Sequence, residues 1–394
     1  MPSGGDWALQ RTAAIFVQGS EDLLVDSCRF IRLDGNALML SSYNRNATIQ
    51  RSEFAWTGTT AIALWGDTEG AEGVPEGMGW DGRAGNQPRG TLISMNLIHE
   101  LGIWEKQSSA LFLAKSCETT FERNFAFNGP RAGINFNDGF GGGNNISQNL
   151  IFNFCRESGD HGPVNSWNRQ VYVAGLPGTA GSDGDTASLS DGSLPFKRYD
   201  AIERNLIIAN YQSAQAVDTD DGSSYFDVHH NLFAYGTGGL KSDYGGHDNR
   251  HHHNVYAYLT HGKAVSIEPQ LPNHTDAFCN NTVVYAARPD WTPGYAEYYC
   301  NTTSRWSDGD AYGLPEMHDN QVYQQGGNNP SETPCVSPCG GVRCMAMAFQ
   351  QQNWTALADW QALGHDLHTE VRNTSELDVG WLLNSSIGLL HTAV

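Results

Sequence analysis

The sequence predicts an all-β fold, a right-handed parallel β-helix, and two observations carry this prediction. An Asn or Ser followed by apolar residues recurs from Ser27 to Asn281, at spacings of 25, 44, 28, 25, 56, 26, 23 and 27 residues. A nearly constant period with two long exceptions indicates stacked repeats that carry two insertions. Each repeat contains short β-rich pieces broken by Gly, Asn or Asp, without a helix between them. Because parallel crossovers are almost always right-handed, we expect a right-handed solenoid of about ten coils.

The recurring polar residue is expected to form a buried ladder at one corner of the coils. Its members are Ser27, Ser52, Asn96, Asn124, Asn149, Asn205, Asn231, Asn254 and Asn281, and Asn320 marks a further coil. A β-propeller is the alternative fold, but its repeats are longer, at about 40–50 residues.

The chain is expected to form two regions of one unit. Residues 1–325 form the β-helix, and residues 326–394 form a Cys-containing loop and a helical cap packed on it. Trp354, Leu357, Trp360 and Leu363 have helical spacing and predict a short amphipathic helix that ends at Gly364. The two insertions, 67–91 and 168–199, are rich in Gly, Pro, Asp and Ser, and are therefore predicted to be loops. Both follow the same strand of their coils, so we expect them to wall a groove.

The composition favours a secreted glycoprotein. A formal net charge of −20 makes nucleic acid an improbable partner, and no run of 18 apolar residues predicts a membrane span. Eight cysteines predict disulfides, and an even cysteine count beside many Asn-X-Ser/Thr sequons is typical of extracellular proteins. Met1 is not followed by the apolar segment of a signal peptide. We therefore expect the chain to lack the N-terminal part of a longer secreted protein. N-linked glycans are expected at some of Asn46, Asn145, Asn273, Asn280, Asn301, Asn353, Asn373 and Asn384.

An acidic stretch, Val217–Ser224, is the centre of the predicted functional site. In a strand, Val217 and Thr219 point inward while Asp218 and Asp220 point outward, and like charges on one face repel. Aligning the coils by their apolar residues places this stretch in outward columns of polar residues. The first column is Asn135, Asn165, Asp218, Lys241 and Ser266; the second is Asn137, Trp167, Asp220, Asp243 and Glu268; Asp138 and Asp221 share the turn column.

Glycoside hydrolysis is the first hypothesis for this site, because it needs two carboxyl groups in different protonation states, and crowded acids provide them. The candidate catalytic residues are Asp160, Asp220, Asp221 and Asp243, with Lys241 and His247 beside them. A polysaccharide is the expected substrate. The candidate substrate-binding residues are Asn135, Asn137, Asp138, His161, Asn165, Trp167, Arg169 and Glu268. Hydrolysis requires no cofactor.

Two alternatives remain open. A polysaccharide lyase would use Lys241 as the base and a calcium ion held by Asp218, Asp220 and Asp243. A non-catalytic glycan-binding or structural β-helix would use these acids to bind calcium for stability.

The chain resembles the right-handed parallel β-helix proteins of the pectate-lyase-like superfamily over nearly its whole length. Glu157-Ser158-Gly159-Asp160-His161-Gly162, followed by Asp220-Asp221-Gly222, looks like the paired motifs of β-helix glycoside hydrolases of family 141 type. This resemblance implies that Asp160 and one of Asp220 and Asp221 form the acid/base pair. His161 stands where that family has Thr, and the 168–199 insertion lengthens the spacing between the motifs. The Gly-His-Gly and Arg-Ile-Lys signatures of polygalacturonases are absent.

Overall fold

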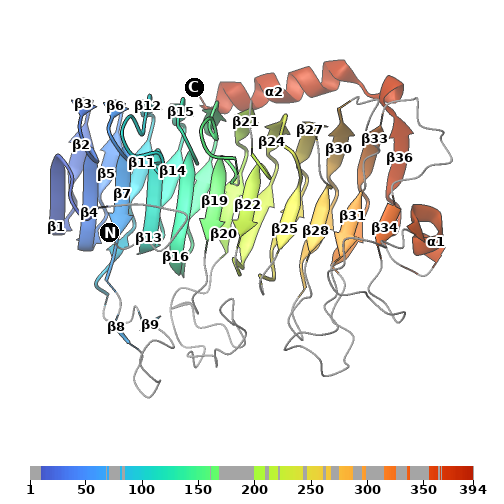
Figure 1. Cartoon of the computed structure of the whole chain (residues 1–394), viewed down its shortest axis with the longest axis horizontal. Coiled ribbons are helices and arrows are strands. Elements are labelled where there is room, and N and C mark those ends of the chain that lie inside the picture. Colours follow the sequence, from blue (N-terminus) through green and yellow to red (C-terminus); the bar gives the residue numbers. More distant parts are fainter. Residues whose placement is uncertain are drawn as a thin grey trace.

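The computed structural model shows an elongated parallel β-helix, with the strands stacked side by side along its long axis (Figure 1). It describes residues 10–67, 69–70, 80–81, 85–159, 161–167, 199–208, 213–220, 222–242, 246–260, 263–267, 275–286, 295–298, 315–324, 335–337, 355–362, 364 and 366–393. The all-β prediction is confirmed: the long sheets are parallel, and successive coils contribute strands to three faces.

The first face carries the candidate site. Its strands are β1 (Ile15–Glu21), β4 (Leu38–Arg45), β7 (Ile62–Trp65), β10 (Pro88–Arg89), β13 (Leu111–Cys117), β16 (Ile134–Gly142), β19 (Val164–Trp167) and β22 (Val217–Asp220). A separate sheet contacts β22 and extends this first face. Its strands are β25 (Leu240–Ser242), β28 (Val265–Ile267), β31 (Ala296–Tyr298), β34 (Cys335–Ser337) and the antiparallel β35 (Thr355–Ala356).

The other two faces are single parallel sheets. One consists of β2 (Leu24–Asp26), β5 (Thr48–Gln50), β11 (Leu92–Ser94), β14 (Thr120–Glu122), β17 (Asn145–Ser147), β20 (Asp200–Glu203), β23 (Phe226–His229), β26 (Arg250–His252), β29 (Ala277–Cys279) and β32 (Glu316–His318). The other consists of β3 (Arg29–Leu33), β6 (Glu53–Thr57), β12 (Leu97–His99), β15 (Phe125–Phe127), β18 (Leu150–Phe152), β21 (Leu206–Ile208), β24 (Leu232–Ala234), β27 (Val255–Leu259), β30 (Thr282–Tyr285), β33 (Gln321–Gln324) and β36 (Glu370–Asn373). A small antiparallel pair, β8 (Glu69–Gly70) and β9 (Trp80–Asp81), lies within the first predicted insertion.

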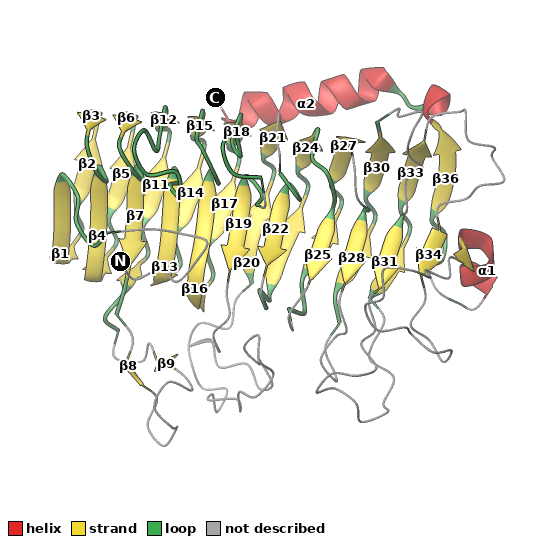
Figure 2. Ribbon diagram, viewed as in Figure 1, coloured by secondary structure: helices red, strands yellow, loops and turns green. Residues whose placement is uncertain are grey.

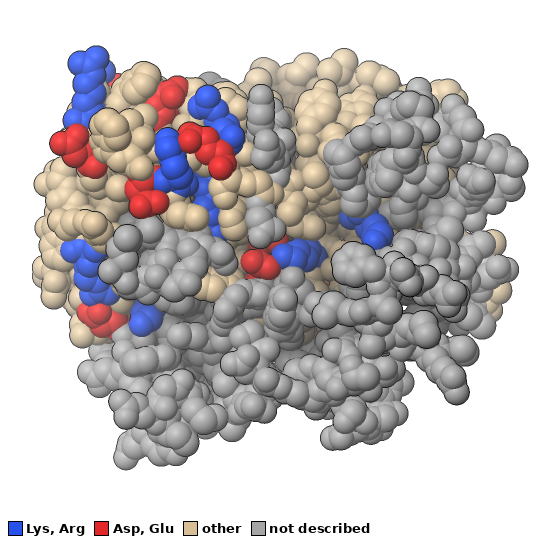
Figure 3. Space-filling view, in the orientation of Figure 1, with Lys and Arg blue, Asp and Glu red and all other residues tan. Residues whose placement is uncertain are grey.

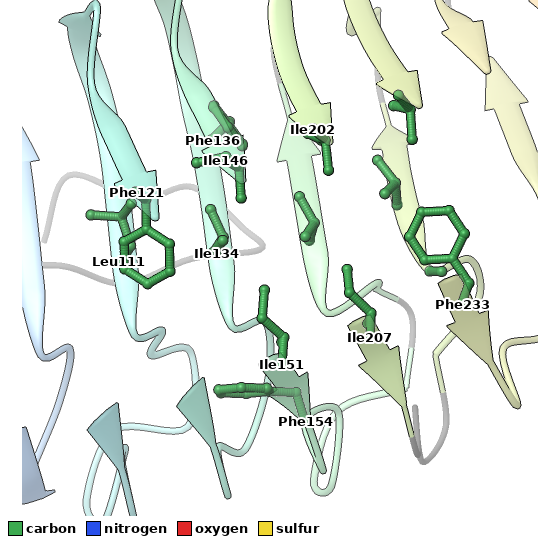
Figure 4. Close-up of a cluster of buried hydrophobic side chains, with 14 of the residues drawn as sticks. Leu111, Phe121, Ile134, Phe136, Ile146, Ile151, Phe154, Ile202, Ile207 and Phe233 are labelled. Atoms are coloured by element: carbon green, nitrogen blue, oxygen red, sulfur yellow. The ribbon is translucent and has the colours of Figure 1, made fainter. Parts of the chain in front are cut away.

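The core fills the inside of the coils, because alternate residues of every strand point inward. Figure 4 shows part of this core, in which Phe121, Ile146 and Ile202 come from successive coils of the second face. His251 continues the same inward row and is buried; burial lowers its pKa to about 3, and its Nδ1 lies 2.6 Å from the Tyr256 hydroxyl. A neutral imidazole therefore sits in an otherwise apolar row.

The predicted ladder is present at the corner between the second and third faces. Asn205 shows the pattern: its Nδ2 donates to Asn231 Oδ1 at 3.0 Å and to the Ile146 carbonyl at 2.9 Å. The same bonds link the buried Asn side chains from Asn96 to Asn320, and Thr369 accepts the last of them. One assignment was wrong by one residue. Cys28, not Ser27, stands opposite the ladder position, and its backbone N–H donates to Ser52 Oγ.

The C-terminal region contains more helix than the sequence predicted (Figure 2). The predicted short helix is α1 (Leu357–Ala362), and a single 3-10 turn covers Thr374–Glu376. The sequence analysis missed the longer α2 (Val379–Ala393), which lies along the third face. Leu382 of this helix packs on Leu206 and Leu232. Among the described residues, no helix is long and apolar enough to cross a membrane.

The expected disulfides are not found where cysteine side chains are described. Cys28, Cys117, Cys155 and Cys279 are free thiols. Cys117 and Cys155 are buried, and burial raises the pKa of each thiol to about 12. The side chains of Cys300, Cys335, Cys339 and Cys344 lie outside the described part of the chain.

Removing one ladder side chain should destabilise the whole fold. Asn205→Ala leaves buried donors on Asn149 and a buried acceptor at Ile146 without partners, so we expect the free energy of unfolding to fall by on the order of 3 kcal/mol. Urea denaturation measures this loss. The neighbouring Arg204→Ala is the control, because that side chain is exposed; equal losses in the two variants would contradict a structural role for the ladder.

Asp366 should make the stability depend on pH. It is buried beside Thr369, whose Oγ1 donates to Asp366 Oδ1 at 2.6 Å, and burial raises the pKa of the carboxyl to about 6. Because the pKa is higher in the folded state, the carboxyl does not oppose folding below about pH 4, and stability falls as the pH rises to about 6. Asp366→Asn should therefore be more stable than the parent at pH 7.5, by up to about 3 kcal/mol, and equally stable at pH 4. Thermal unfolding at the two pH values measures this, and a constant difference would contradict it.

Candidate active site

The strand register confirms the predicted polar columns where their residues are described. Asn135 pairs with Asn165 and Asn165 with Asp218, while Lys241 pairs with Ser266 in the adjoining sheet. In the second column, Asn137 pairs with Trp167, and Trp167 pairs with Asp220. Five successive coils therefore place these side chains on the outward side of one face.

The same columns are apolar in the earlier coils. Phe112 and Ala63 precede Asn135 in the first column, and Met39 precedes Ala63. These three side chains are buried and pack together, with Trp65 and Trp167 at the edge of the cluster. The polar site therefore begins at β16, where the outward residues change from apolar to Asn.

Most of the site is buried rather than open to solvent, although its side chains were predicted to point outward from the coils. Asn135, Asn137 and Asn165 are each 1% exposed, and Asp218 is fully buried. Solvent reaches the side chains of Lys241 and Asp220, which are 22% and 20% exposed. Figure 3 shows charged side chains of both signs side by side on the face viewed there. The site thus has a buried amide floor and a charged opening.

The two acidic side chains of β22 are both paired with Lys241. Its Nζ lies 3.2 Å from Asp218 Oδ1 and 2.5 Å from Asp220 Oδ1, and donates a hydrogen bond to each. An ionised carboxylate as buried as Asp218 is costly unless it is paired and hydrogen-bonded. The ammonium group provides that pairing and holds the two carboxylates at a fixed separation. Part of the charge of the acidic cluster is therefore structural.

The amide floor is a hydrogen-bonded network with spare polar atoms. Asn165 Nδ2 donates to Asn135 Oδ1 at 2.9 Å, and Asn135 Nδ2 donates to Asn137 Oδ1. Asn165 Oδ1 and Asn137 Nδ2 are buried and have no hydrogen-bond partner among the described residues. Buried polar atoms are nearly always satisfied in native proteins. A partner from outside the described residues is therefore expected at this floor, such as a ligand, an ordered water or another part of the chain.

Arg131 is a site residue that the sequence analysis missed. It is 2% exposed; its guanidinium donates to Asn135 Oδ1 at 3.3 Å and lies 3.0 Å from His161 Nδ1. Since arginine only donates, His161 Nδ1 accepts, and the proton of the neutral ring is on Nε2. Burial, reinforced by Arg131, lowers the pKa of His161 to about 4, so the ring is neutral at physiological pH. The only signal in the sequence was the cluster around His161 itself.

The remaining predicted residues fall into two groups. His247 is buried at the next corner, where its Nδ1 lies 2.8 Å from Asp248 Oδ2 and its ring meets Tyr225 edge-on. Asp160, Asp221, Asp243, Arg169 and Glu268 lie outside the described residues, as does the side chain of Asp138.

The structure does not test the calcium site predicted at Asp218, Asp220 and Asp243, because Asp243 lies outside the described residues. Lys241 already supplies the positive charge between Asp218 and Asp220. No group of three or more His, Cys, Asp or Glu side chains within the described ranges is arranged to hold a metal ion. Calcium binding at this site therefore stays a prediction.

Comparison with known proteins identifies no family. No protein-family model matches the chain, and no curated protein sequence matches it. Among solved structures, an alginate lyase from Paenibacillus sp. str. FPU-7 is similar, with 10% sequence identity and a TM-score of 0.37 over 75% of this chain and 94% of that one. At this TM-score, the likeness supports no conclusion about activity.

The ion pairs of Lys241 should be measurable in stability. Lys241→Met removes the ammonium partner of a buried carboxylate, so we expect the free energy of unfolding to fall by on the order of 3 kcal/mol. The double variant Lys241→Met/Asp218→Asn should recover much of this loss, because no charge then remains at Asp218. A double-mutant cycle in urea measures the coupling. Strictly additive losses would show that the two groups do not interact.

Proposed function

We propose that this protein is a carbohydrate-active enzyme that binds a polysaccharide at the polar face of β16, β19, β22 and β25 and hydrolyses its glycosidic bonds. The observation that carries the proposal is the position of Asp220. It is a partly exposed carboxylate, fixed by Lys241, at the opening of a buried row of Asn side chains.

The amide floor is suited to sugar hydroxyl groups, which both donate and accept hydrogen bonds. Asn165 Oδ1 offers an acceptor and Asn137 Nδ2 a donor, and both are buried without partners among the described residues. Trp167 stands opposite Asp220 in the strand register and supplies an aromatic face for the apolar side of a sugar ring. Together these groups offer hydroxyl recognition and stacking next to a carboxylate.

Asp220 is assigned the role of the ionised carboxylate, acting as nucleophile or as general base. Its ion pair with Lys241 requires the ionised form and holds the carboxylate in one position. The second carboxyl group, which protonates the leaving oxygen, is proposed to be Asp160. Asp160 immediately precedes His161 in the sequence and lies outside the described residues. The separation of the two carboxyl groups decides the stereochemistry: about 5–5.5 Å for retention and 6.5–9.5 Å for inversion.

Polysaccharide β-elimination is the second candidate, because Lys241 is a partly exposed amine at the same opening. To act as a base, Lys241 would have to lose a proton that it shares with Asp218 and Asp220, which breaks both ion pairs. Hydrolysis makes no such demand, and we therefore prefer it.

A secreted, N-glycosylated protein remains part of the proposal. Of the predicted glycan acceptors, Asn46, Asn280, Asn373 and Asn384 are exposed, as glycosylation requires. The free buried thiols give no support to a disulfide framework.

Asp220→Asn should reduce the cleavage of whichever polysaccharide in a glycan panel is degraded, by roughly 10²–10⁴-fold, because the variant lacks the ionised carboxylate. The assay measures new reducing ends. Asp378→Asn, which neutralises an exposed acid before α2, is the matched control and should keep full activity. Full activity in Asp220→Asn would refute the assignment.

Lys241→Arg separates the two reactions. Arginine retains a positive charge for both carboxylates but gives up its proton far less readily than lysine, so a hydrolase should keep activity and a lyase should lose most of it. The lyase product also absorbs in the near ultraviolet, because elimination leaves an unsaturated uronate. Binding of a glycan without any cleavage would instead favour a non-catalytic role.

A further inference from the structure

Four histidines form a compact array at the corner between the second and third faces, away from the proposed active site. His229 and His252 end the paired strands β23 and β26 and stand opposite each other in the register. His230 and His253 follow them in the chain, each with a left-handed backbone, at φ of 56° and 55°. Each pair therefore combines the last residue of a strand with the turn residue after it.

The turn points the two rings of each pair at one another. His229 Nδ1 lies 3.0 Å from His230 Nδ1, and His252 Nδ1 lies 3.0 Å from His253 Nδ1. The pairs also stack between coils: ring centroids are 5.0 Å apart for His229 and His252, and 5.0 Å apart for His230 and His253. The same nitrogen geometry thus occurs twice, in consecutive coils.

A carboxylate orients one member of the array. Asp227 Oδ1 lies 3.0 Å from His252 Nε2, which places the ring proton on Nε2 and leaves the lone pair of Nδ1 facing His253. A carboxylate on the far nitrogen is the usual outer partner of a metal-binding histidine, because it fixes the tautomer and raises the basicity of the ring.

Ligand-type side chains continue along the same row. The register places Glu203 before His229, and Cys279 and then His318 after His252. Glu203 Oε2 lies 3.9 Å from His229 Nδ1. The nearby positive charges come from Arg204, on the turn beside Glu203, and Arg250, at the start of β26. The array is therefore flanked by acids as well as by basic side chains.

We propose that the facing Nδ1 atoms of His229 and His230, and of His252 and His253, form two sites for a divalent transition-metal ion such as Zn²⁺, Ni²⁺ or Cu²⁺. Two nitrogens 3.0 Å apart are within reach of a single ion at about 2.0–2.1 Å from each. Imidazole suits these three metals. No three ligand-type side chains of the described ranges are placed to share one ion, so each site offers two protein ligands and water completes the coordination.

The alternative occupant of the 3.0 Å gap is a proton. One imidazole of each pair then donates N–H to the other, and the array is a hydrogen-bonded corner without a role in metal binding. A metal displaces that proton. The hydrogen-bonded array and the metal-bound array therefore differ in whether the protein binds metal and in the tautomer of the turn histidine.

Titration of the untagged, chelator-treated protein with Zn²⁺ by calorimetry tests the proposal, together with thermal unfolding with and without Zn²⁺. We expect up to two ions per chain and a higher melting temperature with metal, because the ion binds the folded chain. His230→Ala/His253→Ala should abolish both effects while leaving the metal-free melting temperature close to that of the parent, since both side chains are exposed. His391→Ala, an exposed histidine on α2, is the matched control and should behave as the parent.

Asp227→Asn provides a second readout, because this substitution changes a metal affinity only if the array binds metal. It should weaken Zn²⁺ binding at the His252/His253 site by about 10–100-fold and leave the His229/His230 site unchanged. Cu²⁺ added to the parent should give an electron paramagnetic resonance spectrum with nitrogen couplings that disappear in the double variant. The proposal is overturned if the parent binds none of these metals, or if the double variant binds them as the parent does.

Discussion

The hydrogen-bonded stack of ladder side chains is the interaction on which the rest of the structure depends. Each Asn accepts from the backbone and side chain of one neighbouring Asn and donates to the next, so a coil cannot shift without breaking bonds on both sides. Stability in such a solenoid is a sum of nearest-neighbour terms, and the ladder makes these terms uniform along the axis. Because it fixes the register, it also fixes which outward residues become neighbours. The active-site columns and the histidine array both follow from it.

The candidate active site places polar groups where the earlier coils place apolar ones. Phe112 and Ala63 pack on the outward side of the first face, and the coils after them replace these residues by Asn135, Asn165 and Asp218 at equal burial. Burying amides and a carboxylate is unfavourable for stability unless each finds a partner. Arg131 and Lys241 supply some of those partners. Asn165 Oδ1 and Asn137 Nδ2 have no partner among the described residues, and polar atoms left open in this way are typical of a site built for a ligand rather than for folding.

The fold and the columns were predictable because both rest on periodicity. Apolar alternation within strands and a constant coil length are enough to align Asn165 with Asp218, even across the 168–199 insertion. Burial was not predictable, since an outward Asn in a strand carries no sign of whether other parts of the chain cover it. Arg131 lies in the connection between β15 and β16, where no repeated residue pattern marked it. The α2 helix was missed because Gly380, Gly388 and two serines dilute its helical pattern, and its packing on Leu206 stabilises it instead.

The left-handed residue that precedes each ladder position has a separate consequence. It recurs along the corner with φ between 52° and 63°, and its identities include Arg51, Met95, Gln148, His230 and Asn280. The fold therefore prescribes a backbone shape at this position while leaving the side chain open. Such a corner is a regular row of display positions, one per coil and about 4.8 Å apart, on which chemistry can change without disturbing the ladder beneath. Substitutions at these positions could therefore place ligand groups at regular intervals along the axis of the protein.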